Sequence, residues 1–101
     1  MPGYLAGWVN ASASIKWGTG FTVTRVSVAG SYRITIPPGT PAKFFAPSVT
    51  PSTLHTIARI AQIQRDAFSG MFLIDVEIRD LTTNALMDGD FSFIALERSG
   101  P

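Results

Sequence analysis

The stretch Phe72–Arg79 constrains the fold more than any other part of this sequence, because its side chains alternate with a period of two. The apolar set comprises Phe72, Ile74, Val76 and Ile78, and the alternate set comprises Leu73, Asp75, Glu77 and Arg79. Successive side chains of a β-strand point to opposite faces of its sheet. The stretch is therefore predicted to be a strand that packs one face on a core and turns the other to solvent.

Other segments alternate in the same way and are rich in Thr, Val, Ile and Phe, which suit a pleated surface. These segments are Phe21–Val28, Tyr32–Ile36 and Phe91–Leu96. Turn-forming residues separate them, at Gly30, at Pro37–Pro41 and within Leu81–Gly89. Short strands separated by turns are typical of a sandwich or barrel. Because 101 residues is the size of one domain, we expect residues 1–101 to form a single all-β antiparallel β-sandwich, jelly-roll-like or lectin-like.

The stretch Thr50–Ser69 has two interpretations. A possible helix at 51–66 would have Thr50 as its N-cap and Pro51 as its first residue. The alternative is a strand over Ile57–Arg65, which we favour because a lone helix would interrupt two strands that otherwise pair simply. Strict alternation would then place Ile57, Arg59, Ala61, Ile63 and Arg65 on one face and Ala58, Ile60, Gln62 and Gln64 on the other.

The charge balance argues against a nucleic-acid partner. Eight Lys and Arg residues oppose seven Asp and Glu residues, and the basic residues are scattered singly. Such a chain offers no positive patch for nucleic acid, so we expect no nucleic-acid partner.

The chain has no apolar run long enough to cross a membrane and no visible signal peptide. Only 15% of its residues are charged, fewer than in typical domains, so we expect copies of the protein or another partner to cover part of its surface.

The titratable residues suggest no catalytic or metal site. His55 is the only histidine and has no acidic neighbour close in sequence, so we expect it to be solvated or locally hydrogen-bonded. Asp88 and Asp90 flank a glycine and are expected to form a turn, since a calcium loop needs more alternating ligands. The chain contains no cysteine. We therefore expect no catalytic residue, no cofactor and no metal.

Asp75 and Glu77 share one face of their predicted strand, as a carboxylate pair in a glycosidase might. They lie on the face opposite the apolar set. We expect this face to be solvated, or the two carboxylates to pair across strands with Arg59 or Arg65.

Several apolar residues are predicted to face away from the core. The segment Phe91–Leu96 is apolar on both faces, which indicates that both faces are covered. Phe44 and Phe45 are adjacent, so one of them should point outward if they lie in a strand. Exposed tryptophan favours protein contacts and sugar stacking, although packing in the core is the more common fate of residues such as Trp8 and Trp17. The candidate interface or ligand contacts are Trp8, Trp17, Phe44, Phe45, Ile94 and Leu96.

A series of strand-and-turn phrases runs through the chain between Gly7 and Glu97. The phrases are GWVNASASIKWGTGFTVTRVSVAGSYRITIPPGTP, APSVTP, ARIAQIQRDAFSGMFLIDVEIRD and DGDFSFIALERSG. Their order resembles short β-sandwich modules of phage tail fibres and of bacterial proteins with collagen-like stalks. In those modules a Gly-Phe-Thr-Val strand precedes a Gly-x-Tyr-x-Ile strand, and a Phe-x-Phe-Ile-Ala strand closes the domain. The resemblance implies a sandwich that assembles as a homotrimer, and it also favours the strand interpretation of Ile57–Arg65.

The chain is more loosely similar to H-type lectins, which have an Arg-x-Ala-containing strand followed by a Gly-Met-Phe strand. No sugar-binding residue of those lectins can be placed on this sequence. We expect a non-enzymatic structural module that assembles with itself, such as a virion decoration, fibre or spike protein. Capsid or tail proteins are candidate partners, and the expected location is the virion or an extracellular surface. The alternative is a carbohydrate-binding, lectin-type module that recognises surface glycans.

Overall fold

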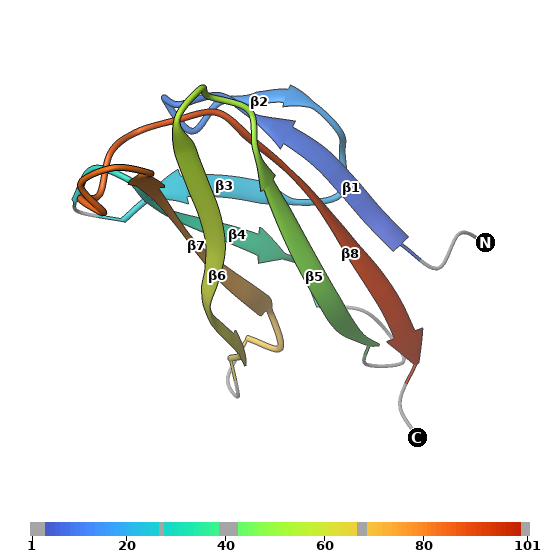
Figure 1. Cartoon of the computed structure of the whole chain (residues 1–101). Coiled ribbons are helices and arrows are strands. Elements are labelled where there is room, and N and C mark those ends of the chain that lie inside the picture. Colours follow the sequence, from blue (N-terminus) through green and yellow to red (C-terminus); the bar gives the residue numbers. More distant parts are fainter. Residues whose placement is uncertain (1–3, 27, 39–42, 67–68, 100–101) are drawn as a thin grey trace.

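The computed structural model describes residues 4–26, 28–38, 43–66 and 69–99, except for the side chains at positions 43, 44, 98 and 99. The described part is an antiparallel β-sandwich (Figure 1). Its strands are β1 (Tyr4–Val9), β2 (Ile15–Trp17), β3 (Thr22–Arg25), β4 (Ser31–Ile36), β5 (Lys43–Pro51), β6 (Thr56–Arg65), β7 (Phe72–Asp80) and β8 (Phe91–Ser99). Within these residues no helix is long and apolar enough to cross a membrane. The all-β prediction is therefore confirmed.

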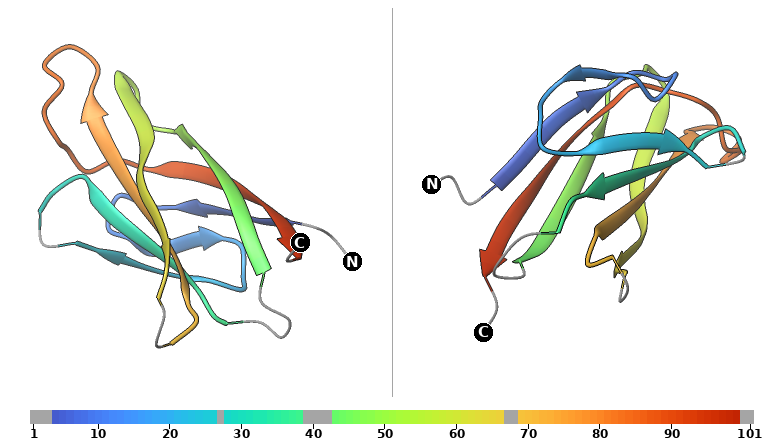
Figure 2. Two further views of the ribbon diagram at one scale, coloured as in Figure 1. Left: turned by 90° about the horizontal axis from the view of Figure 1, so that it is seen from below. Right: turned by 180° about the vertical axis from the view of Figure 1, so that it is seen from behind.

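The strands form two four-stranded sheets. Sheet A has the order β2-β1-β8-β5, and sheet B has the order β3-β4-β7-β6. The chain crosses between the sheets after β2, β4, β5 and β7, so each sheet mixes strands from distant parts of the sequence (Figures 1 and 2). Because β1 and β8 are antiparallel, Tyr4 pairs with Leu96 at the end of the sandwich where β1 begins and β8 finishes. We call this the terminal end and the opposite one the loop end.

The core lies between the two sheets and follows the predicted alternation. The buried apolar residues are Val9, Phe21, Tyr32, Ile34, Ile36, Phe72, Ile74, Val76, Ile78, Phe91, Phe93 and Ala95. The rings of Phe21 and Phe93 meet edge to face, with centroids 4.9 Å apart. Gly7 makes this contact possible, because a Cβ at that position would collide with both rings.

The segment with two interpretations is a strand, and the helix at 51–66 does not form. β5 continues to Pro51, and β6 occupies Thr56–Arg65. The chain turns between them at His55, whose φ is 61°. Pro51 ends β5 in sheet A, and β6 pairs along β7 in sheet B, so the segment contributes to both sheets.

Strict alternation along β6 was wrong, because a β-bulge interrupts it. The register with β7 shifts between Ile60 and Gln62, which pair with Val76 and Asp75. The extra residue resets which face each side chain occupies. Beyond it, Ile63 pairs with the buried Ile74. Ile60 and Ile63 therefore share the inward side, which strict alternation would have forbidden.

The outer face of sheet B carries ion pairs, and we call it the B face. Arg33 donates to Asp75 from Nε at 2.8 Å and from Nη2 at 3.1 Å. Glu77 accepts from Arg59 Nε at 2.8 Å and from Arg79 Nε at 3.3 Å. Arg59 therefore pairs with Glu77 as expected, while Asp75 pairs with Arg33. The bulge places Arg65 on the inward side, in register with Phe72.

Polar contacts at the loop end tie the last loop to the sandwich. The buried Tyr32 donates its hydroxyl to the carbonyl of Ala11 at 2.7 Å, and that hydroxyl accepts from the Gly89 N–H at 3.2 Å. Asp88 accepts from Arg25 at 2.6 Å and from the Gly30 N–H at 2.8 Å. Burial, with a smaller contribution from Asp88, raises the pKa of the Tyr32 phenol. These contacts fix the loop that leads into β8.

Candidate functional site

The outer face of sheet A is formed by the residues whose neighbours along each strand point into the core. Cross-strand register aligns them in rows. The rows are Trp17, Trp8, Ser92 and Thr50; then Ala6, Ile94 and Ser48; then Tyr4, Leu96 and Ala46. We call these residues the A face. None of them has a charged side chain, so this face differs sharply from the B face.

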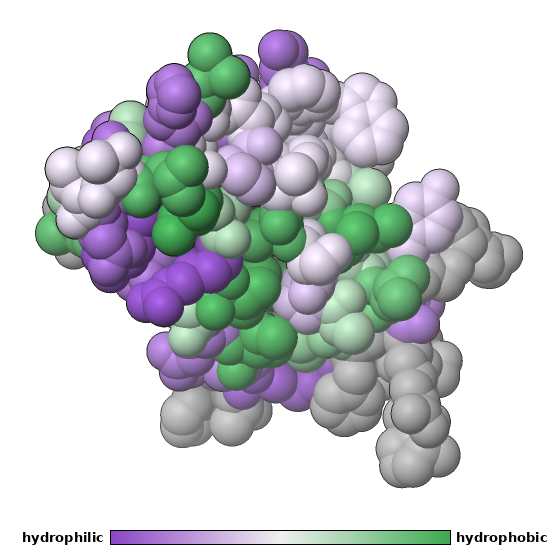
Figure 3. All heavy atoms as spheres, in the orientation of Figure 1, coloured by the Kyte–Doolittle hydropathy of each residue, from purple (hydrophilic) through white to green (hydrophobic). Residues whose placement is uncertain are grey.

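The large side chains of the A face are open to solvent. Trp17 is 62% exposed, Leu96 58%, Tyr4 50%, Ile94 42% and Trp8 39%. Single exposed apolar residues are common on proteins, but neighbouring ones that form a patch indicate an interaction surface. In the space-filling view, hydrophobic residues gather over β8 and β5 and continue across β6 (Figure 3). The apolar surface is therefore continuous rather than scattered.

A cation stands beside the tryptophan pair. Lys16 Nζ lies 4.8 Å from the centroid of a Trp8 ring, within range for a cation–π contact. Trp8 and Trp17 are cross-strand neighbours, so two partly exposed indoles lie next to each other. Tryptophan is enriched among the residues that contribute most of the binding energy at protein interfaces.

The structure brings together several of the residues that the sequence singled out, although they come from opposite ends of the chain. Trp8, Trp17, Ile94 and Leu96 all belong to the A face. Phe45 does not, because β5 pairs it with the inward-facing Glu97, and its ring packs 5.2 Å from that of Phe72. The backbone of Phe44 lies in β5, but its side chain is outside the described residues.

Sequence reasoning missed the contribution of β1. Tyr4 and Ala6 lie on the A face beside Trp8, while Leu5 and Val9 point inward. A period-two signal is present here, but Gly7 and Ala6 weaken the contrast between its two sets. The alternation becomes readable once Gly7 is known to be a core position filled by the rings of Phe21 and Phe93.

The edges of the two sheets are poorly suited to pairing with further strands. One edge strand of sheet A is β5, which contains Pro47 and Pro51, and proline cannot donate to a ladder. The long edge strand of sheet B, β6, contains the bulge. The other edge strands, β2 and β3, have only three and four residues. Prolines, bulges and short edge strands discourage edge pairing, so contact with other molecules is expected to use a face.

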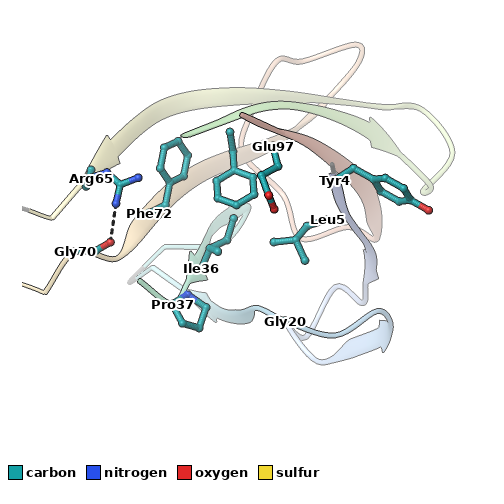
Figure 4. Close-up of a pocket in the computed structure, with 10 residues that line it drawn as sticks. Tyr4, Leu5, Gly20, Ile36, Pro37, Arg65, Gly70, Phe72 and Glu97 are labelled. Carbon is teal, nitrogen blue, oxygen red and sulfur yellow. Dashed lines mark hydrogen bonds between the residues drawn. The ribbon is translucent and has the colours of Figure 1, made fainter. Parts of the chain in front are cut away.

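A pocket of about 360 Å³ opens between the sheets at the terminal end (Figure 4). Leu5 and Phe45 contribute to its wall from sheet A, and Ile36 and Phe72 contribute from sheet B. Arg65 and Glu97 also line it. The volume is within the range of small-molecule sites. This is the second candidate site of the molecule.

The titratable residues His55, Asp88 and Asp90 lie in connections between strands. Within the part of the chain that the structure describes, no group of three His, Asp or Glu side chains could hold a metal ion. Asp88 and Asp90 both accept backbone N–H groups, Asp90 from Ala11 at 2.7 Å. His55 is exposed, and its carbonyl accepts from the N–H of Leu81 at 2.8 Å. These residues hold turns in place.

Comparison of the chain with protein-family models, with curated proteins and with solved structures finds no match.

Proposed function

We propose that this protein is a non-enzymatic structural module that assembles with copies of itself through the A face. The observation that carries the proposal is the uncharged, partly exposed surface built from Trp8, Trp17, Ile94 and Leu96. Aromatic and aliphatic side chains without charges are typical of the buried centres of protein interfaces. The blunted edges of both sheets favour association by this face over strand pairing.

We propose a homotrimer, as a virion decoration, fibre or spike module on a particle or extracellular surface. The trimer and this setting rest on the resemblance to fibre modules described above. In a ring of three, each copy presents its A face to a different surface of its neighbour or turns it toward a common axis. Either arrangement covers the side chains that are exposed in the single chain.

Size-exclusion chromatography with light scattering tests the proposal. At micromolar concentration we expect three times the chain mass. Leu96→Glu places a charge on the A face and should yield a folded monomer, because burying an unpaired carboxylate costs several kcal/mol. The matched control is Gln62→Glu, which adds the same charge on the outer side of sheet B and should leave the mass unchanged.

A folded wild-type monomer across this concentration range would refute self-assembly. A dimer or tetramer would retain the role of the A face and refute the trimer. Loss of assembly in Gln62→Glu but not in Leu96→Glu would move the interface to sheet B.

The second candidate function is carbohydrate binding, which the adjacent indoles of Trp8 and Trp17 support. Exposed aromatic rings present apolar faces on which sugars stack. A glycan array probed with the wild-type protein and with Trp17→Ala tests this function. Signals that disappear in the variant would support it, and a blank array would remove it.

A further inference from the structure

We propose that the pocket at the terminal end binds small organic cations, namely primary amines with one apolar ring or a short alkyl body, and that Glu97 receives the ammonium group. The pocket lies between the sheets and shares Tyr4 with the A face. The inference concerns the single chain and does not require the proposed self-assembly.

Glu97 stands at a position where the fold otherwise places core residues. Phe91, Phe93 and Ala95 are the preceding inward residues of β8, and each is buried. The alternation continues to Glu97, which pairs with the inward-facing Phe45. Its carboxylate points between Leu5 and Ile36, into the space between the sheets (Figure 4). A carboxylate at such a place favours positively charged neighbours, whether they belong to the chain or to a ligand.

The walls of the pocket suit the apolar body of such a ligand. Leu5 and Ile36 are aliphatic, and the rings of Phe45 and Phe72 pack together at 5.2 Å between centroids. Aromatic faces attract ammonium groups as well as apolar atoms. The pocket thus combines a site for positive charge with a surface for one ring.

Arg65, which also lines the pocket, already interacts with Gly70 and Phe72. Arg65 Nη1 donates to the carbonyl of Gly70 at 3.0 Å. Its guanidinium lies 5.8 Å from the centroid of the Phe72 ring. These contacts hold Arg65 to one side of the pocket, as Figure 4 shows. An anionic ligand would meet the carboxylate of Glu97 in the space between the sheets, whereas a cationic ligand would meet an oppositely charged group there.

Glu97 also has an interaction within the chain, so an ammonium group must share or displace it. We therefore expect weak binding, with Kd on the order of 1 mM. The probe is benzylamine, titrated into the ¹⁵N-labelled protein and followed by amide chemical shifts. The expected result is a saturable shift of the amides of Leu5, Phe45, Phe72 and Glu97. Benzyl alcohol and benzoate, of similar size, should produce roughly tenfold weaker effects because they cannot form the charged hydrogen bond.

Glu97→Gln should weaken benzylamine binding at least about tenfold while the remaining amide spectrum keeps its dispersion. The matched control is Glu77→Gln, the same change on the B face, which should leave binding unchanged. Stronger binding of benzoate would overturn the proposal in favour of an anion site at Arg65. Equal binding of benzyl alcohol and benzylamine, or no saturable shift with any of the three probes, would also overturn it. The three-probe comparison uses the wild-type protein, so it decides the question even if Glu97→Gln fails to fold.

Discussion

Both outer faces of the sandwich consist of alternate residues along the strands, but the B face carries paired charges and the A face carries uncharged side chains. On the B face, neighbouring strands set Arg33 against Asp75 and Arg59 against Glu77. On the A face, neighbouring strands set Tyr4 against Leu96 and Trp8 against Trp17. Both faces consist of alternate residues whose neighbours fill the core. The core therefore does not explain the difference between them.

The difference indicates separate roles for the two sheets. The paired charges of the B face are satisfied within one chain and remain compatible with water. The A face leaves large apolar side chains exposed in the single chain, which a second molecule can cover. The outward residues of sheet A should thus matter for association, and those of sheet B for stability of the single chain.

The largest expected effect separates the two sides of β8. Phe93→Ala removes a buried ring that packs on Phe21 and should lower the free energy of unfolding by about 3–5 kcal/mol. Its neighbour Ile94 lies on the A face. Ile94→Ala should lower the free energy of unfolding of the dilute monomer by less than about 1 kcal/mol. Urea denaturation of both variants at low protein concentration measures the two losses. Equal losses would mean that the A face is part of the folding core.

An intermediate effect tests the charges of the B face. The Arg59 guanidinium, with help from Arg79, holds the pKa of Glu77 below its usual range. A carboxyl with a lowered folded pKa stabilises the chain above its unfolded pKa of about 4.3 and loses this contribution as pH falls through the folded value. Glu77→Gln should cost about 1 kcal/mol at pH 7, measured by urea denaturation.

The cost of Glu77→Gln should shrink as pH falls below about 4, because the wild-type carboxyl then becomes neutral as well. Thr35→Ser on the same outer face is the uncharged control. A cost that stays constant from pH 7 to pH 3 would show that the ion pairs of Glu77 contribute nothing.

The smallest expected effect concerns salt. Assembly through an uncharged face should respond little to ionic strength, so the association constant should change less than about threefold between 0.05 and 1 M NaCl. Sedimentation velocity at both salt concentrations measures it. Strong dissociation in 1 M NaCl would indicate that ion pairs hold the interface together. That result would favour the B face as the interface.

Much of the fold was predictable because alternation is a local property of the chain. Phe72–Arg79 is almost the whole of β7, and Tyr32–Ile36 lacks only the first residue of β4. β1, β2 and β5 were not assigned, since glycine, alanine and proline weaken their patterns. The bulge in β6 was also missed, because an extra residue in a ladder becomes visible only beside the partner strand.

The candidate sites show the same division. The sequence named Trp8, Trp17, Ile94 and Leu96 as candidate interface or ligand contacts, but it could not place them together. It also left open which of Phe44 and Phe45 faces the core. The register of β5 with β8 settles the position of Phe45. The inward carboxylate of Glu97 was not noticed, because alternation was followed only to Leu96.

The sequence by itself determined that this chain forms strands, and it determined which side chains alternate within most of them. Only the tertiary structure decided that β1 and β8 lie side by side in sheet A, which brings Tyr4 against Leu96. It also decided that Arg65 and Glu97 face the same pocket from opposite sheets. The physical reason is that alternation comes from the geometry of one strand, whereas strand order and register depend on hydrogen bonds and burial between residues far apart in the chain.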